Sequence, residues 1–303
     1  VFHSVRDEKI AGWVQWSTRS GDIFQSVAAL NENLITVGKR SLNGSTVYTL
    51  EKFGDDDTIT LDCQTTSTIN QRGTPLVDGG SQSGTTLVID GLTSAPKVNE
   101  QFTIAGNATE YTISSLVDNG SGEYLLTLHK TLAATPGDGA AITFTKGFLH
   151  TVNGIYTNES INVVEGNSSI GTFTVSGSDT ITLVNAPKAT ALKVGFNFIP
   201  IVETMPIDKE LPEGPLTGLP RRISRAIVDL NSTLDMTIKG ADSTSKSLVV
   251  QQVNFSGGSD LVPVTEKKEF FFLGYNKSPT ITISQDDPLP MKILGMSVEV
   301  VFA

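Results

Sequence analysis

The chain is poor in cysteine, in charge and in long apolar runs. It has one cysteine, Cys63, among 303 residues, and 18% of its residues are charged. A single cysteine excludes a disulfide within the chain and a zinc site built from several thiolates. No run approaches the roughly 18 consecutive apolar residues of a membrane helix, since even 191–202 contains Lys193 and Asn197. We therefore expect no membrane-spanning segment.

Residues that usually carry out catalysis or bind metals are few and scattered. His3, His129 and His150 lie far apart, and no P-loop, dinucleotide-binding glycine motif, zinc-protease motif or nucleophile elbow occurs. Half-exposed strand positions are expected for the histidines, and a small buried side chain for Cys63. The acidic run 55–57 lacks the alternating spacing of a calcium loop and is expected to be a solvated turn. We therefore expect no enzyme activity, no cofactor and no metal site.

The charge balance is strongly acidic. The chain carries 22 basic and 32 acidic side chains, a formal net charge of −10. Such a chain repels phosphate on average, which excludes sequence-independent binding to nucleic acid or to anionic lipid. Its 28 glycines and 38% hydrophobic residues fall in the globular range, and the deficit of charge is taken up largely by Ser, Thr, Asn and Gly. This composition is typical of a folded β protein.

Apolar and polar residues alternate with a period of two along most of the chain, which predicts half-buried strands. The turn Asn43-Gly44 between two alternating runs is a strong hairpin signal, because type I′ turns need positive φ at both central residues. Only segment 221–230 has a pattern that would also fit a helix, and its β-branched residues favour a strand. We therefore expect an all-β fold of several antiparallel β domains. The first four alternating runs are 13–17, 23–30, 34–39 and 47–53.

The length predicts two or three domains, and breaks rich in glycine and proline between the predicted strands indicate where the domains divide. Glycines at 79–80 and 147 bound a set of five predicted strands that suits a small barrel inserted in a loop. The segment from Pro206 to Pro220 holds four prolines and is expected to be a connector without regular structure. The predicted parts are the end of a propeller-like platform (1–57), a β-sandwich domain (58–74 with 148–207), an inserted small β-barrel module (75–147) and a C-terminal β domain (208–303).

A lone propeller blade cannot bury its faces, so we expect the chain to be the C-terminal portion of a longer protein. One basic cluster stands out in it: Arg221, Arg222 and Arg225. In a strand Arg221 and Arg225 are expected on one face and Arg222 on the other. The cluster is either a solvated strand edge that discourages stray pairing or a subunit contact in which guanidinium groups meet carboxylates of a neighbouring chain. Asp286 and Asp287, in a predicted turn, complete this candidate subunit interface.

The order of several segments resembles the tail nozzle proteins of short-tailed bacteriophages, a family also called tail tubular protein B. The blocks begin with Trp-Val-Gln-Trp-Ser at 13–17, include Arg-Arg-Ile-Ser-Arg at 221–225, and end with Asp-Asp-Pro-Leu-Pro at 286–290. Together they cover most of the chain outside 75–147. The remaining blocks are 23–28, 34–40, 148–150, 159–166, 180–183, 194–196 and 274–275.

The resemblance implies a structural virion protein, assembled in the host cytoplasm. In this family six chains form a ring below the tail adaptor and enclose the channel through which double-stranded genomic DNA leaves. Such a ring would carry about −60, six times the charge of one chain. An acidic lumen would repel phosphate, so that DNA slides through without being held. The 75–147 module departs from the family pattern and is a candidate contact for tail fibres or a packing ornament.

Two other classes stay open at this point. A glycan-binding adhesin would also be all-β and rich in Asn, Thr and Gly, although it would be expected to offer exposed aromatic rings, and this chain has only two tryptophans and five tyrosines. A depolymerase would need two carboxylates about 5–9.5 Å apart, which a sequence cannot place.

Overall fold

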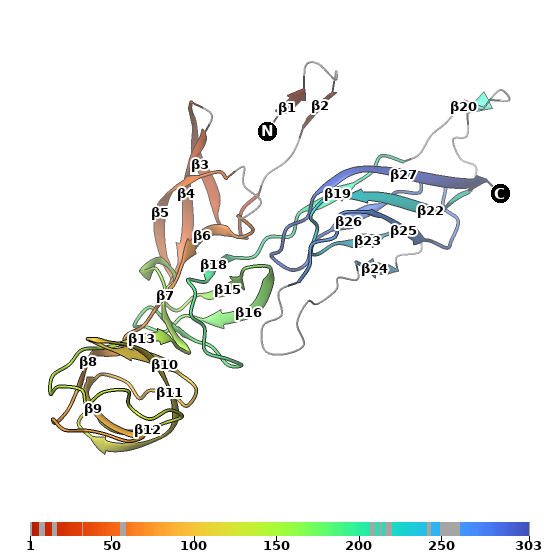
Figure 1. Ribbon diagram of the computed structural model, residues 1–303. Coiled ribbons are helices and arrows are strands. Elements are labelled where there is room, and N and C mark those ends of the chain that lie inside the picture. Colours follow the sequence, from red (N-terminus) through yellow and green to blue (C-terminus); the bar gives the residue numbers. More distant parts are fainter. Residues whose placement is uncertain are drawn as a thin grey trace. The chain divides into compact units, whose positions relative to one another are not determined.

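The computed structural model describes residues 2–5, 10–13, 17–31, 33–54, 59–206, 210–211, 214–215, 220–240, 244–248 and 261–302. Strands dominate this part of the chain, which has one short 3-10 helix, η1 (Gly154–Tyr156), and no longer helix (Figure 1). Its paired strands run antiparallel wherever their register is resolved, as between β3 and β4 or between β22 and β27. The predicted all-β fold is confirmed.

The chain forms two compact units. Unit 1 consists of Val1–Gln64, Asn162–Gly171 and Gly195–Ala303, and unit 2 of Thr65–Ile161 and Thr172–Val194. The four-part division expected from the sequence stays a prediction. Four strands contribute residues to both units: β6 (Asp62–Thr66), β15 (Ser160–Glu165), β16 (Ser168–Thr174) and β18 (Lys193–Phe196).

Unit 2 is built around a six-stranded sheet in the order β13-β10-β11-β12-β9-β8. Its two edge strands meet through a bridge between Leu76 and Ala141, and the Val77 N–H donates to the Ala140 carbonyl at 2.9 Å. These contacts bend the sheet into a nearly closed barrel. The strands are β8 (Gly73–Val77), β9 (Thr86–Leu92), β10 (Gln101–Ile104), β11 (Asn107–Gly120), β12 (Glu123–Leu128) and β13 (Ile142–Lys146).

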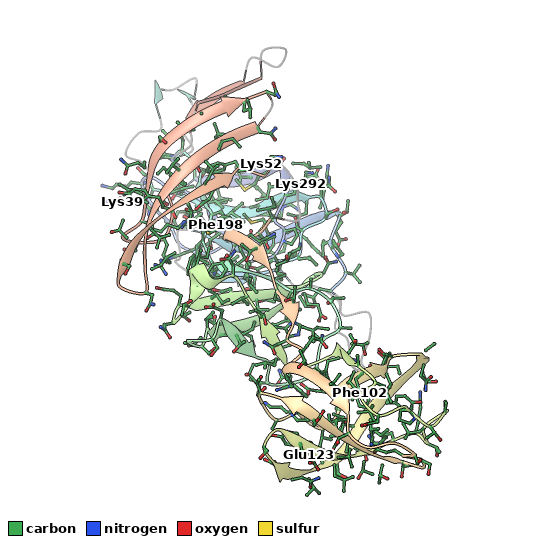
Figure 2. The ribbon with its side chains drawn as sticks, turned by 90° about the vertical axis from the view of Figure 1, so that its left-hand side faces the viewer. Lys39, Lys52, Phe102, Glu123, Phe198 and Lys292 are labelled. Carbon is green, nitrogen blue, oxygen red and sulfur yellow. The ribbon has the colours of Figure 1, made fainter. Side chains whose placement is uncertain are left out.

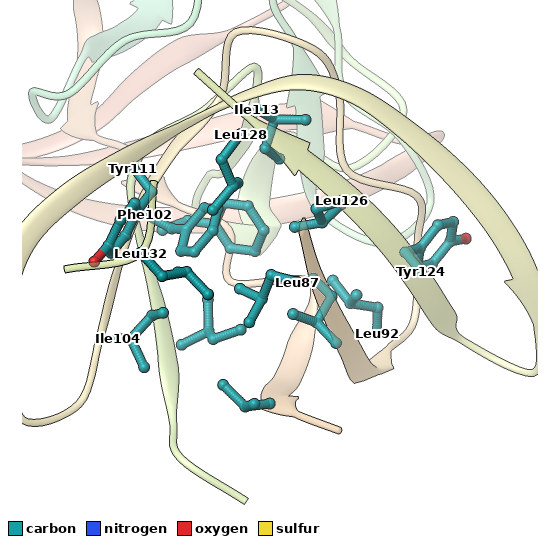
Figure 3. Packing of buried hydrophobic residues seen from close by; sticks show 14 residues of the cluster. Leu87, Leu92, Phe102, Ile104, Tyr111, Ile113, Tyr124, Leu126, Leu128 and Leu132 are labelled. Carbon is teal, nitrogen blue, oxygen red and sulfur yellow. The ribbon is translucent and has the colours of Figure 1, made fainter. Parts of the chain in front are cut away.

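The barrel interior is filled by the inward-facing residue of every second strand position. Fourteen buried apolar residues form this core (Figure 3). Phe102 lies at its centre, with its ring centroid 5.9 Å from that of Tyr111 and 6.1 Å from that of Phe144. Figure 2 shows Phe102 among the barrel strands, with Glu123 on the β11–β12 hairpin. Such alternation is what the period-two pattern of the sequence predicts.

Three glycines of the barrel, Gly73, Gly91 and Gly122, have no room for a side chain, and Gly91 is the tightest of them. Gly91 in β9 has φ +73°, and a Cβ atom there would lie 2.3 Å from the Thr74 carbonyl oxygen. Strand β8 therefore approaches β9 this closely only because position 91 is glycine.

A second, three-stranded sheet of unit 2 has the order β17-β14-β7. His150 lies in the central strand opposite Ile69 and Ile181 and is completely buried. Its Nδ1 is 3.2 Å from the Ser67 hydroxyl and its Nε2 is 3.3 Å from the Gly147 carbonyl oxygen. The strands are β7 (Thr68–Ile69), β14 (Leu149–Thr151) and β17 (Thr180–Thr182).

A buried ion pair fixes the chain where it leaves the barrel. The Arg72 guanidinium donates to Glu100 Oε1 at 2.6 Å, and both side chains are buried. The same carboxylate accepts the Phe148 N–H at 2.9 Å and the Lys97 N–H at 2.9 Å. Because these contacts satisfy both carboxylate oxygens, the buried charge is compensated.

The N-terminal part of unit 1 contains a three-stranded sheet in the order β3-β4-β5. The predicted turn between β4 and β5 is confirmed, since Asn43 and Gly44 have φ values of +47° and +70° and the flanking pair is Leu42 with Ser45. The bounds are β1 (Phe2–Val5), β2 (Ile10–Trp13), β3 (Ile23–Leu30), β4 (Asn33–Leu42) and β5 (Ser45–Lys52).

The C-terminal part of unit 1 consists mainly of two sheets, β19-β26-β23-β24 and β25-β22-β27. Both contribute to one buried cluster, in which Ile223 and Val228 of β22 join Ile238 of β23 and Ile283 of β26. Segment 221–230 is thus a strand, as its β-branched residues predict. The bounds are β19 (Ile201–Glu203), β22 (Arg221–Leu230), β23 (Thr237–Lys239), β24 (Ser245–Ser247), β25 (Lys267–Phe271), β26 (Thr282–Ser284) and β27 (Ile293–Phe302).

The expectation of no regular structure between Pro206 and Pro220 is wrong at one place. Strand β20 (Glu210–Leu211) pairs with β21 (Gly214–Pro215), Glu210 lying opposite Pro215. Pro215 lacks an N–H, but an isolated strand pair has outward-facing positions that need none.

Candidate subunit interface

The three arginines lie on β22, the central strand of its sheet, but they are not distributed over its two faces as the sequence predicted. Arg221 is buried, at 1% exposure, and exchanges two 2.9 Å backbone hydrogen bonds with Asn276. Arg225 lies on the opposite, outward face together with Arg222, because the pairing with β27 shifts register between Ile223 and Arg225. The predicted sharing of one face by Arg221 and Arg225 is therefore wrong, since a β-bulge reverses the alternation after Ile223.

The two outward arginines differ in their partners. Arg225 is paired within the chain, its Nε 3.1 Å from Glu299 and its Nη1 3.6 Å from Glu269. These groups are well exposed, so each pair is worth about 1 kcal/mol or less. Arg222 instead places its guanidinium over the ring of Tyr275, 5.4 Å from the centroid. Among the described residues, this cation–π contact is the one interaction of the Arg222 side chain that the structure resolves.

Exposed apolar side chains occupy every second position from Phe271 to Tyr275, the segment that runs beside β22. Phe271, which lies opposite Arg225, is 63% exposed, Leu273 is 69% exposed and Tyr275 is 52% exposed. We call Arg222, Phe271, Leu273 and Tyr275 the aromatic–arginine patch. Aromatic residues and arginine are the types most enriched at protein interfaces. Sequence reasoning missed this patch, although three successive phenylalanines at 270–272 in a strand require the middle one to point away from the core.

Asp286 and Asp287 follow β26 in a turn, as predicted. Their backbone N–H groups both donate to Asp235 Oδ2 at 2.9 Å, which draws three carboxylates together. Partial burial, and then the charges of Asp235 and Asp286, raise the pKa of Asp287 above its ordinary value. We call Asp235, Asp286 and Asp287 the acidic turn. The side chains of Asp286 and Asp287 are exposed to solvent.

The structure does not bring the arginines and the acidic turn together in one chain. Arg222 is the second residue of β22, whereas Asp235 lies five residues beyond the last, Leu230. At about 3.3 Å per residue, the eight steps from Arg222 to Leu230 span about 26 Å. The acidic turn belongs to the other sheet, where it follows β26, and it lies toward the Leu230 end of β22, because the Leu234 N–H donates to the Pro290 carbonyl and the Asn231 N–H to the Lys292 carbonyl.

A buried charge cluster around Arg40 is a feature that sequence reasoning did not find. Arg40 is 1% exposed and makes ion pairs with Asp22 at 3.2 Å, Glu51 at 2.7 Å and Asp62 at 2.7 Å. The hydroxyl of Thr18 also accepts from Arg40 and donates to Asp62 at 2.6 Å. The one sequence signal is an inward position: Arg40 shares a face of β4 with the buried Thr36 and Leu42.

The cluster shifts the ionisation of its members. Burial alone lowers the pKa of Arg40, but hydrogen bonds to Glu51 and Asp62 outweigh it and raise that pKa. Burial likewise raises the pKa of Asp62, but hydrogen bonds from Arg40 and Thr18 and the Arg40 charge bring it below its ordinary value. Arg40 and Asp62 are thus held in their charged forms, and the ion pairs of Arg40 tie β4 to β5, to β6 and to the residue that precedes β3.

The remaining singled-out residues form no site. His129 is exposed, whereas His150 is buried and hydrogen-bonded, which corrects the expectation of a half-exposed position for it. Cys63 is half-buried rather than buried, because its φ of +55° interrupts the alternation of β6. The acidic run 55–57 and the side chain of His3 lie outside the described residues. Within the described ranges, no group of three or more His, Cys, Asp or Glu side chains is placed to hold a metal ion.

Comparison with known proteins gives no relative: neither a protein-family model nor a curated protein matches this chain. In the ranges that the structure describes, none of the helical structure is long and apolar enough to traverse a bilayer.

Proposed function

We propose that this chain is a structural subunit of a virion, part of the ring-shaped tail nozzle of a short-tailed bacteriophage. In this proposal six copies enclose the DNA exit channel, attach to the tail adaptor and are assembled in the host cytoplasm. The proposal builds on the collinear blocks of sequence that resemble this family. It needs no active site, cofactor or metal.

The observation that carries the proposal is the amount of apolar side chain left exposed on well-formed sheets. In the β3-β4-β5 sheet, Ile23, Lys39 and Tyr48 lie directly opposite one another, and Leu50 lies two residues along on the same face. Ile23 is 53%, Tyr48 61% and Leu50 78% exposed. Lys39 and Lys52, both labelled in Figure 2, place two charges on this otherwise apolar face, Lys52 lying opposite Ile35. Exposed apolar faces of this kind mark surfaces that other protein covers.

A second such surface lies along edge strand β19. Strand β19 pairs along one edge with β26 and exposes Ile201 and Val202, and Met205 just beyond it is exposed as well. An uncovered apolar edge strand invites uncontrolled pairing with other chains, which natural proteins avoid by covering it. A subunit of a closed assembly covers such an edge when the assembly forms.

The acidic charge supports a conduit rather than a nucleic-acid binder. A chain with a formal charge of −10 repels the DNA backbone on average, so DNA would pass through a ring of copies without being held. A retarded band for duplex DNA at physiological salt would contradict this part of the proposal.

Electron microscopy of the purified protein tests the assembly. Six-fold rings with a central pore are the expected result. Particles that stay monomeric at concentrations of tens of micromolar, alone and with the tail adaptor, would overturn the proposal.

The exposed rings of Tyr48 and Tyr275 favour glycan binding as a second candidate function, since sugar rings stack on aromatic faces. A glycan array separates the two candidates. Binding that is lost in both Tyr48→Ala and Tyr275→Ala, by a protein that forms no rings, would favour an adhesin.

A further inference from the structure

We propose that the aromatic–arginine patch of one copy binds the acidic turn of the next copy, with Arg222 paired to Asp286 and Asp287. The occupant of the patch is thus a second copy of this chain. This inference rests on the proposed function, because it specifies a contact that joins identical subunits into a ring.

The patch offers a cation without a carboxylate. In the ranges that the structure describes, Arg225 has two carboxylate partners but Arg222 has none, and its guanidinium rests on the ring of Tyr275. Stacking on Tyr275 holds the guanidinium plane in place, and although Nε is buried without a hydrogen-bond partner within the described part of the chain, the terminal N–H groups stay available for a planar carboxylate. Phe271 and Leu273 provide the apolar rim that excludes water from such a pair.

The acidic turn offers carboxylates without a cation. Asp235 accepts two backbone N–H groups, and the Asp286 side chain accepts the Thr237 hydroxyl at 3.3 Å. Across the described residues, no lysine or arginine forms an ion pair with Asp286 or Asp287. Three carboxylates gathered in this way repel one another, and partial burial together with the charges of Asp235 and Asp286 raises the pKa of Asp287. An incoming guanidinium would relieve that repulsion.

The separation of the two sites makes the contact intermolecular. Because the acidic turn lies toward the Leu230 end of β22, about 26 Å of strand from Arg222, Arg222 does not reach Asp286 of its own copy. Each copy therefore presents one patch and one acidic turn, and a patch-to-turn contact repeats head to tail. A head-to-tail contact closes into a ring when the rotation between neighbours divides a full turn. The same contact places opposite charges against each other, which favours association between two copies that each carry a net charge of −10.

Charge reversal tests the pairing on the full chain. Arg222→Glu and Asp287→Arg each place like charges opposite one another, and each is expected to raise the dissociation constant of the assembly by about tenfold or more in sedimentation velocity over a dilution series. The double variant restores an opposite-charge pair at every contact and is expected to recover most of the wild-type association. Lys130→Glu, which changes the charge by the same amount as Arg222→Glu at an exposed position of unit 2, is the matched control for that variant and is expected to leave association unchanged.

The outcomes separate this inference from the proposed function. If the wild-type chain forms no rings under any condition, the proposed function fails and the inference with it. If wild-type rings form and both single variants form them equally well, the inference alone is overturned. Single variants that lose rings without rescue in the double variant also overturn it, provided that circular dichroism shows all variants folded. A closed two-fold dimer of the wild type overturns the head-to-tail arrangement.

Discussion

Replacing Arg40 by methionine should strongly destabilise unit 1. The substitution keeps most of the side-chain volume but removes the one cation that Asp22, Glu51 and Asp62 share. The Asp22 side chain is fully buried, so water cannot take the place of the guanidinium. Leaving a buried charge without its partner typically costs about 3–5 kcal/mol. We expect a loss of that size, because the three carboxylates also repel one another.

The dependence of stability on pH should change sign in Arg40→Met. In the wild type the pKa of Asp62 lies below its ordinary value of 3.8, so its contribution to stability is present above pH 3.8 and is lost as the pH falls through the folded-state pKa. Without Arg40, burial is the largest remaining influence and raises the pKa of Asp62. The variant should therefore gain stability as the pH falls from 7 toward 5, where the wild type changes little.

Hydrogen exchange measured by mass spectrometry reports the effect locally. Peptides that cover 33–52 should exchange faster in Arg40→Met. The protection of β4, expressed as a free energy, should fall by the whole loss in the free energy of unfolding. Arg225→Met is the matched control, since its two ion pairs are exposed, and it should lose about 1 kcal/mol or less. A loss below 1 kcal/mol in Arg40→Met would refute the idea that the cluster ties the strands together.

Three further substitutions test other parts of the structure. Phe102→Ala should destabilise unit 2 by about 3–5 kcal/mol in urea unfolding, because it empties the centre of the barrel core. Gly91→Ala should lower the free energy of unfolding by about 2–4 kcal/mol, since the new Cβ meets the Thr74 carbonyl. Gly106→Ala is the control: this position also has positive φ but open space around it, so the loss should be about 1 kcal/mol. Equal losses in the two variants would contradict the steric argument. Asp287→Asn should melt at the wild-type temperature or slightly above it at pH 7, with the difference vanishing as the pH falls through the raised pKa of Asp287; a lower melting temperature would speak against like-charge crowding.

The fold class and many strands follow from local sequence signals. The turn at Asn43-Gly44 needs positive φ at both residues, and these two residue types adopt it readily. Segment 221–230 is a strand because its β-branched residues fit a pleated, half-buried surface. Both signals act over a few residues, which is why they can be interpreted without the rest of the chain.

Features that depend on distant residues could not be predicted. The register shift between Ile223 and Arg225 is set by how β22 fits against β27, some 75 residues away, so the face of Arg225 was predicted wrongly. The burial of Arg40 depends on Asp22 and Asp62, each roughly 20 residues from it. Of the candidate interface, the residue types were visible in sequence, but the stacking of Arg222 on Tyr275 and the gathering of Asp286 around Asp235 arise only in the folded chain.

The near-closure of the barrel shortens the loop that must close when the interrupted sheet of unit 2 forms. Strand β7 pairs with β14, so that Ile69 meets His150 across 81 intervening steps of chain. Once Leu76 and Ala141 are joined, the path between the same two residues shortens to about 16 steps, 7 before the bridge and 9 after it. The entropic cost of closing the loop between Ile69 and His150 then falls by about 1.4 kcal/mol. If the barrel folds first, it therefore brings the two halves of the interrupted sheet together. Strand β7 then stays unpaired until β14 has been synthesised.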